Sequence, residues 1–341
     1  MSEQEGVPVY RYRPSLPYHI LEDADQPMWR RLLWHARDLM GWRSFRVMKS
    51  VLAEVRPDMV VTHNLRGMGM SVMQPLKLYN VPWTHVLHDV QLLVPSGLWW
   101  QDRSTLWQSA PIRAGYQAWM RSWMGSPACV IGPTNYVIDT HVQRGYFSAS
   151  KHVVLQNPVA FPDALEKTAS DTEALQLLSV GQLSENKGID ILLRALEHVK
   201  TPVELQIVGS GPEEAALTQR ALALPEHINV ALTGRIPHQE VFDRMARADA
   251  FVFPSLAIEN CPGVLLEARS VGAKIIASDV GGVSELVHES GLVPPGDVRA
   301  LSQKIEDLKH GGVEVLGADG LLSLEAYIRQ FVAVLSSVKR S

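Results

Sequence analysis

Short apolar runs alternate with longer amphipathic segments through the second half of the chain. The runs occupy residues 175–181, 203–208, 228–233, 250–254, 274–278 and 291–293. Runs of this kind between turn residues are typical of buried strands, whereas apolar residues that recur with a helical period indicate helices. Strands that alternate with helices predict a parallel sheet with right-handed crossovers, so we expect residues 170–320 to form one α/β domain.

The first half repeats this alternation less regularly. Strands are predicted at residues 9–14, 59–62, 83–87, 128–133 and 152–156. Residues 28–55 show a long helical pattern that is expected to kink at Gly41. A chain of 341 residues exceeds one ordinary core, so we expect a second α/β domain over residues 1–160, followed by a polar linker. The helical pattern at 324–341 is expected to cross back to that first domain.

Composition narrows the class of protein. Hydrophobic residues make up 46% of the chain and charged residues 20%, as in a folded globular protein. The separation of Cys129 and Cys261 suits neither a disulfide framework nor a metal site, so a reducing compartment is expected. No apolar run is long enough to span a membrane, and the acidic, polar start does not resemble a signal peptide. We therefore expect a cytoplasmic protein.

The formal net charge of −4 is unevenly distributed. Residues 1–160 hold 16 Lys and Arg against 11 Asp and Glu, a net +5, and the remainder holds 16 against 25, a net −9. The basic first half suggests an anionic partner or a membrane surface. The chain as a whole is not basic enough to predict nucleic-acid binding.

The most informative stretch follows the apolar run at 250–254. Asn260 and Pro262 predict the start of a helix, because Asn is a favoured cap and Pro fits the first turn, and Gly272 predicts its end. The first N–H groups of such a helix have no partner within it, and its positive dipole end attracts anions. These groups belong to Gly263, Val264 and Leu265.

Two carboxylates flank this predicted anion site. Glu259 lies just before the helix and Glu267 lies a turn inside it. A phosphate cradle between two carboxylates suits a ligand with a phosphate in the middle and a polyol at each end, which describes a nucleotide sugar. Taken alone, Glu267 is explained equally well as a solvated residue in the first turn of a helix.

The spacing of Glu259 and Glu267, with Asn-Cys-Pro-Gly at 260–263, resembles the signature of the retaining nucleotide-sugar glycosyltransferases of family four. That family has the GT-B fold, in which two α/β domains face each other across a cleft. The resemblance extends, with gaps, from about Val9 to the last helix. It implies that the first domain faces the acceptor and that the second binds the donor nucleotide.

Other strand ends carry the same resemblance. Thr-His-Asn-Leu at 62–65 and Leu-His-Asp at 87–89 resemble the family's acceptor domain, where the second histidine lies beside the donor sugar. This implies that role for His88, although a structural imidazole would be the simpler interpretation of His88 alone. Lys187 matches the lysine of a segment in which the family holds the leaving diphosphate with an arginine and a lysine. Gln182 occupies the arginine's position, so one cation is missing.

Glycines and an arginine end the remaining strands of the second half. Gly209 and Gly211 form a short turn that opens a helix, which is a weak signal of ligand contact. Arg235 lies where the family's backbone meets the nucleobase. Gly281 and Gly282 are expected to let the backbone approach the pyrophosphate. Any one of these could be an ordinary turn, and their order along the chain supports the resemblance.

The resemblance implies transfer of a hexose from a UDP- or GDP-sugar to an acceptor hydroxyl, with retention at the anomeric carbon, in the synthesis of cell-surface polysaccharide, glycolipid or another glycan. Lys187 and the helix N–H groups would stabilise the departing diphosphate. Glu259 would position the sugar hydroxyls, Glu267 the ribose hydroxyls, and His88 the reacting side of the sugar. No metal-binding motif is present in the sequence, so neither a metal nor a further cofactor is expected.

Tryptophans and arginines are concentrated in two segments of the first half. Residues 28–55 carry Trp29, Trp34 and Trp42 among several cationic residues. This pattern fits an amphipathic helix that covers a sheet, and also a face that contacts anionic lipid on the inner face of the membrane. Residues 96–125 are expected to form a helix and loop that face the acceptor. Their aromatic and cationic side chains are Trp99, Trp100, Trp107, Trp119, Trp123, Arg103, Arg113 and Arg121.

The start of the sequence departs from the family's pattern. The family opens with a strand and a glycine-rich loop, followed by a helix and another strand, before any stretch like Gly-Val-Pro-Val at 6–9. A late start and a natural short form are both open interpretations. We therefore expect nucleotide binding with weak or absent transfer. A nucleotide-sugar-binding or regulatory protein with a degenerate acceptor domain is the alternative, and a GT-B UDP-sugar epimerase is less favoured.

Overall fold

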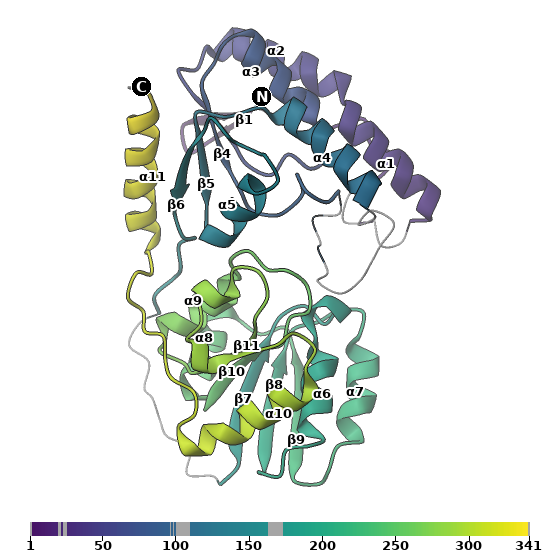
Figure 1. The fold of residues 1–341 in the computed structure, drawn as a ribbon, viewed down its shortest axis with the longest axis vertical. Helices are drawn as coiled ribbons and strands as arrows, with labels where there is room; N and C mark the ends of the chain where they lie inside the picture. Colours follow the sequence, from purple (N-terminus) through teal and green to yellow (C-terminus); the bar gives the residue numbers. More distant parts are fainter. Residues whose placement is uncertain are drawn as a thin grey trace.

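Two parallel sheets organise the chain, one in each half (Figure 1). The computed structural model describes residues 2–19, 22, 26–95, 97, 99, 110–162 and 173–339. The sheets lie in two α/β bodies that are stacked one above the other and joined by two crossings of the chain. At the crossings, Val159 N–H donates to Leu322 O at 2.9 Å.

The second sheet has six parallel strands in the order β12-β11-β10-β7-β8-β9. They are β7 (Leu175–Val180), β8 (Val203–Val208), β9 (Ile228–Gly234), β10 (Ala250–Phe253), β11 (Ile275–Ser278) and β12 (Leu292–Val293). The six strands predicted from apolar runs are thus confirmed. The chain order reverses between the neighbouring strands β10 and β7. Their carboxyl ends therefore form a topological switch point, where open α/β sheets bind ligands.

Helices cover both faces of this second sheet. They are η4 (Glu185–Lys187), α6 (Ile189–Leu196), α7 (Glu214–Leu222), α8 (His238–Arg247), α9 (Gly263–Ser270), η5 (Val283–Glu285), η6 (Glu289–Gly291), α10 (Val298–Asp307) and η7 (Leu308–His310). Buried side chains of α6, α7 and α10 pack with Leu177 and Leu205 on one face. Those of α8 and α9 pack with Leu178 and Phe251 on the other.

The first sheet has four parallel strands in the order β3-β4-β5-β6. They are β3 (Val60–Thr62), β4 (Trp83–Val86), β5 (Cys129–Gly132) and β6 (Lys151–Val154). The helices of this body are α1 (Met28–Met40), α2 (Trp42–Val55), η2 (Met70–Val72), α3 (Met73–Leu78), α4 (Ala110–Met124), α5 (Asn135–Val142) and α11 (Leu324–Lys339). Val338 of α11 packs with Cys129 and Ile131, so the end of the chain lies against the first sheet (Figure 1).

The predicted helical segment 28–55 breaks at Gly41, as expected, into α1 and α2. Its aromatic face is divided between core and surface. Trp34 is fully buried and its Nε1 donates to Tyr18 O at 3.2 Å, whereas Trp29 and Trp42 are exposed. The buried Trp34 fits a helix that covers a sheet, and the exposed Trp29 and Trp42 fit a face that contacts lipid.

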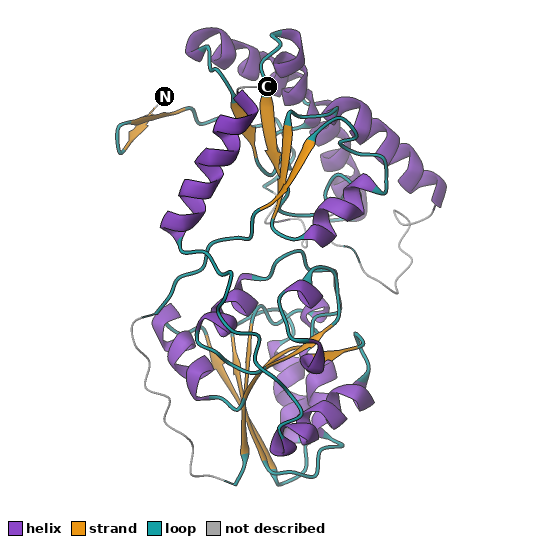
Figure 2. Ribbon diagram, turned by 60° about the vertical axis from the view of Figure 1, so that its left-hand side comes forward, coloured by secondary structure: helices purple, strands orange, loops and turns teal. Residues whose placement is uncertain are grey.

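The predicted strand at 9–14 is wrong. Residues 2–9 instead form an antiparallel hairpin of β1 (Ser2–Gln4) and β2 (Val7–Val9), which projects beside the first body in Figure 2. Glu5 and Gly6 both have positive φ, as a two-residue hairpin turn requires. The turn pairs Gln4 with Val7, so Val9 ends a strand and does not begin one.

Part of the predicted aromatic segment 96–125 lies outside the described residues, including Trp100, Arg103 and Trp107. Most of the described remainder forms the helix α4, in which the rings of Trp119 and Trp123 meet edge to face, whereas Trp99 lies before it with the Arg144 guanidinium 4.6 Å from its ring centre. Across the part of the chain that the structure describes, no helix combines the length and the apolar character that crossing a bilayer requires.

Candidate functional site

A cavity of about 340 Å³ opens at the topological switch point of the second sheet. The residues that line it come from the ends of β7 and β10, from η4 and the start of α6, from the loop before α9, and from the starts of α8 and α9. Its polar and backbone groups include Gln182, Lys187, His238, Glu259, Gly263, Val264 and Glu267. Six of the twelve residues predicted for catalysis or donor binding thus line one cavity: Gln182, Lys187, Glu259, Gly263, Val264 and Glu267.

Lys187 and Glu259 pair inside this cavity. Lys187 Nζ lies 2.6 Å from Glu259 Oε1, and both side chains are partly buried. Ser255 Oγ donates to the same carboxylate oxygen at 3.0 Å. The ammonium also lies 5.9 Å from the ring centre of Phe253, on the last residue of β10. Two oppositely charged groups that are 72 positions apart are therefore held together at the mouth of the sheet.

Close backbone contacts fix the loop between β10 and α9. Gly281 has a φ of +63°, and a Cβ on it would lie 2.1 Å from Glu259 O. A Cβ on Gly282 would lie 2.2 Å from Asn260 O. The two glycines therefore let one loop pack on the backbone that carries Glu259. The predicted approach of these glycines to a pyrophosphate stays a prediction.

The amino terminus of α9 only partly matches the prediction. Gly263 and Val264 line the cavity, but Leu265 is fully buried and its N–H donates to Pro262 O at 3.1 Å. The expectation of a free N–H at Leu265 is therefore wrong, because a tight first turn uses that group. Asn260 is not the cap either, since Pro262 is the cap residue and its side chain has no donor or acceptor to offer.

Glu267 lies on α9 and faces the start of α8. His238 Nε2 is 3.0 Å from Glu267 Oε1, and the His238 ring lies 4.9 Å from that of Phe242. His238 is the first residue of α8 and was missed by the sequence analysis. Its only sequence signal is a polar residue placed directly after Pro237 at the end of a predicted strand.

The remaining predicted donor-binding residues lie outside the lining of the cavity. Gly209 has a φ of +143°, and a Cβ on it would lie 1.8 Å from Gly181 O. Gly211 similarly packs on Leu183 O. Both glycines therefore serve the packing of neighbouring loops. Arg235 is exposed and its Nε donates to Ser210 Oγ at 2.9 Å.

His88 of the first body contacts the second body through its backbone. His88 is exposed at the end of β4, and its backbone O accepts a hydrogen bond from Asn260 Nδ2 at 2.9 Å. Asn260 O in turn accepts from Thr134 Oγ1 at 3.1 Å. Asn260 therefore ties the loop that carries Glu259 to the first body, which is a different role from the predicted cap.

Glu285 forms a second link between the bodies. Its carboxylate accepts from Asn135 N–H at 2.8 Å, Asn135 Nδ2 at 2.9 Å and Tyr136 N–H at 2.7 Å. These are the first N–H groups of α5, where a negative charge is favoured by the helix dipole. Glu285 of the second body thus caps a helix of the first body.

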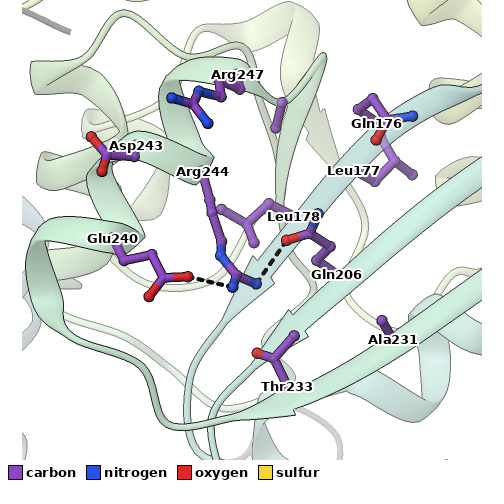
Figure 3. Close-up of a pocket in the computed structure, with 11 residues that line it drawn as sticks. Gln176, Leu177, Leu178, Gln206, Ala231, Thr233, Glu240, Asp243, Arg244 and Arg247 are labelled. Atoms are coloured by element: carbon purple, nitrogen blue, oxygen red, sulfur yellow. Dashed lines mark hydrogen bonds and ion pairs between the residues drawn. The ribbon is translucent and has the colours of Figure 1, made fainter. Parts of the chain in front are cut away.

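A second cavity, of about 650 Å³, lies lower on the second sheet between α8 and the face of β7, β8 and β9 (Figure 3). Arg244 donates to Gln206 and to Glu240 there, at 2.8 and 2.6 Å. Its central cation is therefore already paired within the protein. We place the candidate site in the smaller cavity because that one lies at the switch point.

Comparison with known proteins gives a family match for the second body. Residues 174–310 match the family "Glycosyl transferases group 1". An uncharacterized 42.6 kDa protein in the cps region of Klebsiella pneumoniae is 27% identical over 84% of this chain and 74% of its own length. The second body therefore carries a group 1 glycosyltransferase domain.

Named enzymes match mainly over part of the chain. The amylovoran biosynthesis glycosyltransferase AmsK of Erwinia amylovora is 32% identical over 42% of this chain and 38% of its own length. A GDP-mannose-dependent monoacylated alpha-(1-6)-phosphatidylinositol monomannoside mannosyltransferase of Corynebacterium glutamicum is 35% identical over 42% of this chain and 41% of its own length. The matches thus span about two fifths of these two enzymes.

Solved structures show the fold of most of the chain. The crystal structure of Anabaena Alr3699/HepE in complex with UDP superposes with a TM-score of 0.67 at 19% identity, over 86% of this chain and 82% of the other. The predicted α/β class and GT-B fold are confirmed.

Proposed function

We propose that this protein is a retaining glycosyltransferase that moves a hexose from a UDP- or GDP-sugar to an acceptor hydroxyl in cell-surface polysaccharide or glycolipid synthesis. The observation that carries the proposal is the cavity at the switch point. It gathers a cation, two carboxylates and the amino terminus of α9, which are the groups needed for a diphosphate between two polyols.

The positions of these groups suggest a role for each. Lys187 and the N–H groups of Gly263 and Val264 would hold the diphosphate, and its negative charge grows as the bond to the anomeric carbon breaks. Glu259 lies beside Lys187 and would accept hydrogen bonds from the sugar, whereas Glu267 lies on the His238 side and would accept them from the ribose. The acceptor oxygen then bonds to the same face of the anomeric carbon, and its proton passes to the departing diphosphate oxygen.

Stabilisation of the leaving group, and not a carboxylate nucleophile, would supply the catalysis. Glu259 is already bonded to Lys187 and Ser255. These bonds lower its electron density and suit it to orient hydroxyls. The proposed reaction uses no metal. The relatives' names support glycan synthesis, and one names GDP-mannose, so the donor nucleotide is to be determined by experiment.

The direct test is transfer from labelled donor. The purified chain is incubated with UDP-glucose, UDP-galactose or GDP-mannose and with a glycolipid extract from the source cells as acceptor, and labelled lipid or polymer is quantified. Label is expected in the product with one donor, and Lys187→Ala should abolish it. Lys200→Ala is the matched control, because Lys200 is exposed, lies in the loop before β8 and does not line the cavity. Absence of transfer and of donor hydrolysis would contradict the proposal.

One observation favours a second function. Gln182 lines the cavity where the resemblance implies an arginine, so the diphosphate would meet one cation fewer. A protein that binds a nucleotide sugar without transferring it would tolerate this loss. Donor binding without turnover in the same assay would identify that function.

A further inference from the structure

Two histidines of the first body bond to each other close to the second body. His63 follows β3 and His88 lies two residues beyond β4, and these strands are parallel neighbours. His63 Nδ1 lies 2.8 Å from His88 Nε2. The ring centres are 5.2 Å apart and the ring planes differ by 26°. The separation of the centres is close to the nitrogen–nitrogen distance plus one ring radius at each end, so the rings meet edge to edge.

An edge-to-edge contact between two ring nitrogens requires one proton between them. Each neutral imidazole has one N–H and one bare nitrogen. In one arrangement, His63 Nδ1 carries the shared proton, and the proton of His88 then lies on its own Nδ1. In the other arrangement, His88 Nε2 carries the shared proton, so His88 Nδ1 is bare and His63 is protonated at Nε2. The tautomers of the two rings are therefore coupled.

The surroundings favour a neutral His63. Burial lowers the pKa of His63, and the nearby His88 lowers it further. His85 lies close behind, and its Nδ1 is 2.8 Å from Thr62 Oγ1. Burial and the neighbouring histidines lower the pKa of His85 to about 3, so this group adds no charge at neutral pH.

Charged and polar neighbours hold the loop that follows β4, and they leave the ring nitrogen Nδ1 of His88 without a hydrogen bond from the described residues. The Asp89 carboxylate accepts from Gln91 N–H at 2.8 Å and from Asn64 Nδ2 at 3.3 Å, and Arg66 is a further charge beside it. From the second body, Asn260 Nδ2 donates to His88 O. Within the described part of the chain, no hydrogen bond engages His88 Nδ1.

We propose that His63 is a positioning residue, which holds a single shared proton against His88 Nε2 and so fixes the orientation of the His88 ring, the ring that the resemblance to family-four glycosyltransferases would set beside the donor sugar. The role in transfer rests on the proposed function, whereas the paired rings do not. Loss of the bond would leave His88 free to rotate and to exchange tautomers. His63 would then affect the chemical step more than the binding of the nucleotide.

The pairing is tested first without any substrate. Nitrogen-15 spectra of the histidine side chains of the full chain are compared for the wild type, His63→Leu and His63→Asn. The Asn amide reaches about as far as Nδ1 and can restore the bond. We expect the His88 ring-nitrogen signals to shift in His63→Leu and to remain near wild type in His63→Asn. The exposed His310→Leu is the control. His88 signals that are unchanged in His63→Leu would overturn the proposal.

The role in catalysis is tested by a double-mutant cycle. His63→Leu should lower kcat by about tenfold, the equivalent of one hydrogen bond, with little change in KM for the donor. In a His88→Leu background the same change should cost nothing more, and His63→Asn should recover most of the rate. Additive losses would show that His63 acts independently of His88 and would overturn the proposal. The spectra can show the histidine pair even if neither the wild type nor any variant turns over a donor. In that case the proposed transfer fails and the pairing stands.

Discussion

Lys187 Nζ and Glu259 Oε1 lie 2.6 Å apart, so the cation and the carboxylate that the donor would use are bonded to each other. Each charge offsets the other while the site holds no anion. A diphosphate would draw the ammonium toward itself, and the sugar hydroxyls would then donate to the carboxylate. The ion pair thus keeps both groups in position at the mouth of the second sheet before the donor arrives.

We expect Lys187→Ala to reduce kcat far more than it changes the free energy of unfolding. Lys187 lies at the entrance of a helix and is partly exposed, so little packing is lost, whereas the leaving diphosphate loses its cation. Gln182→Arg should raise kcat or donor affinity by restoring a second cation. Steady-state kinetics and urea unfolding of each variant are the measurements. If neither substitution alters turnover or donor affinity, the diphosphate does not lie against these residues.

We expect Glu285→Ala to loosen the contact between the two bodies. The substitution removes three hydrogen bonds to the start of α5. It also removes the negative charge that interacts favourably with the positive end of the α5 dipole. Small-angle X-ray scattering should show a larger radius of gyration for this variant. Glu289→Ala is the matched control, because Glu289 is exposed on the same part of the chain. Equal radii for Glu285→Ala and the wild type would contradict this role.

Two buried histidines should make the protein less stable in mild acid. Burial lowers the pKa of His85 to about 3 and that of His141 to about 4, below the value near 6.5 of an unfolded chain. Below pH 6.5 the unfolded state binds protons that the folded state does not, so the free energy of unfolding should fall as the pH is lowered to about 4. The expected slope is about 1.4 kcal/mol per pH unit for each histidine.

Asp38 opposes part of this effect, because burial raises its pKa to about 6 and its contribution to stability is lost as the pH rises through that value. Urea unfolding between pH 7 and 4 measures the balance. His141→Leu should flatten the slope, and the exposed His310→Asn should not. A slope that His141→Leu leaves unaltered would show that this histidine does not titrate between the two states.

The exposed face of α1 should bind anionic membranes. Met28, Trp29, Leu32 and Leu33 are exposed apolar residues, and Arg31 lies among them. Vesicles that contain anionic lipid should sediment with the protein at low salt and release it as salt rises, because screening weakens the attraction. Trp29→Ser should weaken binding, and Val332→Ser on α11, which is similarly exposed, should not. If the protein fails to bind vesicles at every salt concentration, α1 only packs on the first body and does not contact lipid.

Local sequence patterns predicted the strands of the second sheet and the polar residues that follow them. Apolar runs located the six strands of the second sheet, and strand ends located Lys187, Glu259 and Glu267, which share one cavity. This worked because parallel strands bring their carboxyl ends to one edge of a sheet. The spacing alone did not show that Lys187 and Glu259 bond to each other.

Contacts that depend on how the two bodies meet could not be predicted. Asn260 has the chemistry of a cap, yet its amide reaches His88 O, 172 positions away. Glu285 caps a helix that begins 150 positions earlier. Within the second body, the positive φ of Gly281 lets it lie against the backbone of Glu259, 22 positions away, which local sequence did not reveal either. Such roles require the docked geometry of distant segments.

The most direct test of the account is calorimetric binding of UDP and GDP to the wild type and to Glu267→Ala. We expect one of the nucleotides to bind, and Glu267→Ala to weaken that binding by about 1.5–3 kcal/mol, because Glu267 would accept hydrogen bonds from the ribose hydroxyls. Glu289→Ala, at an exposed carboxylate outside the cavity, should bind as the wild type does. Nucleotide binding that is absent from the wild type, or equally strong in Glu267→Ala, would contradict a donor site in this cavity.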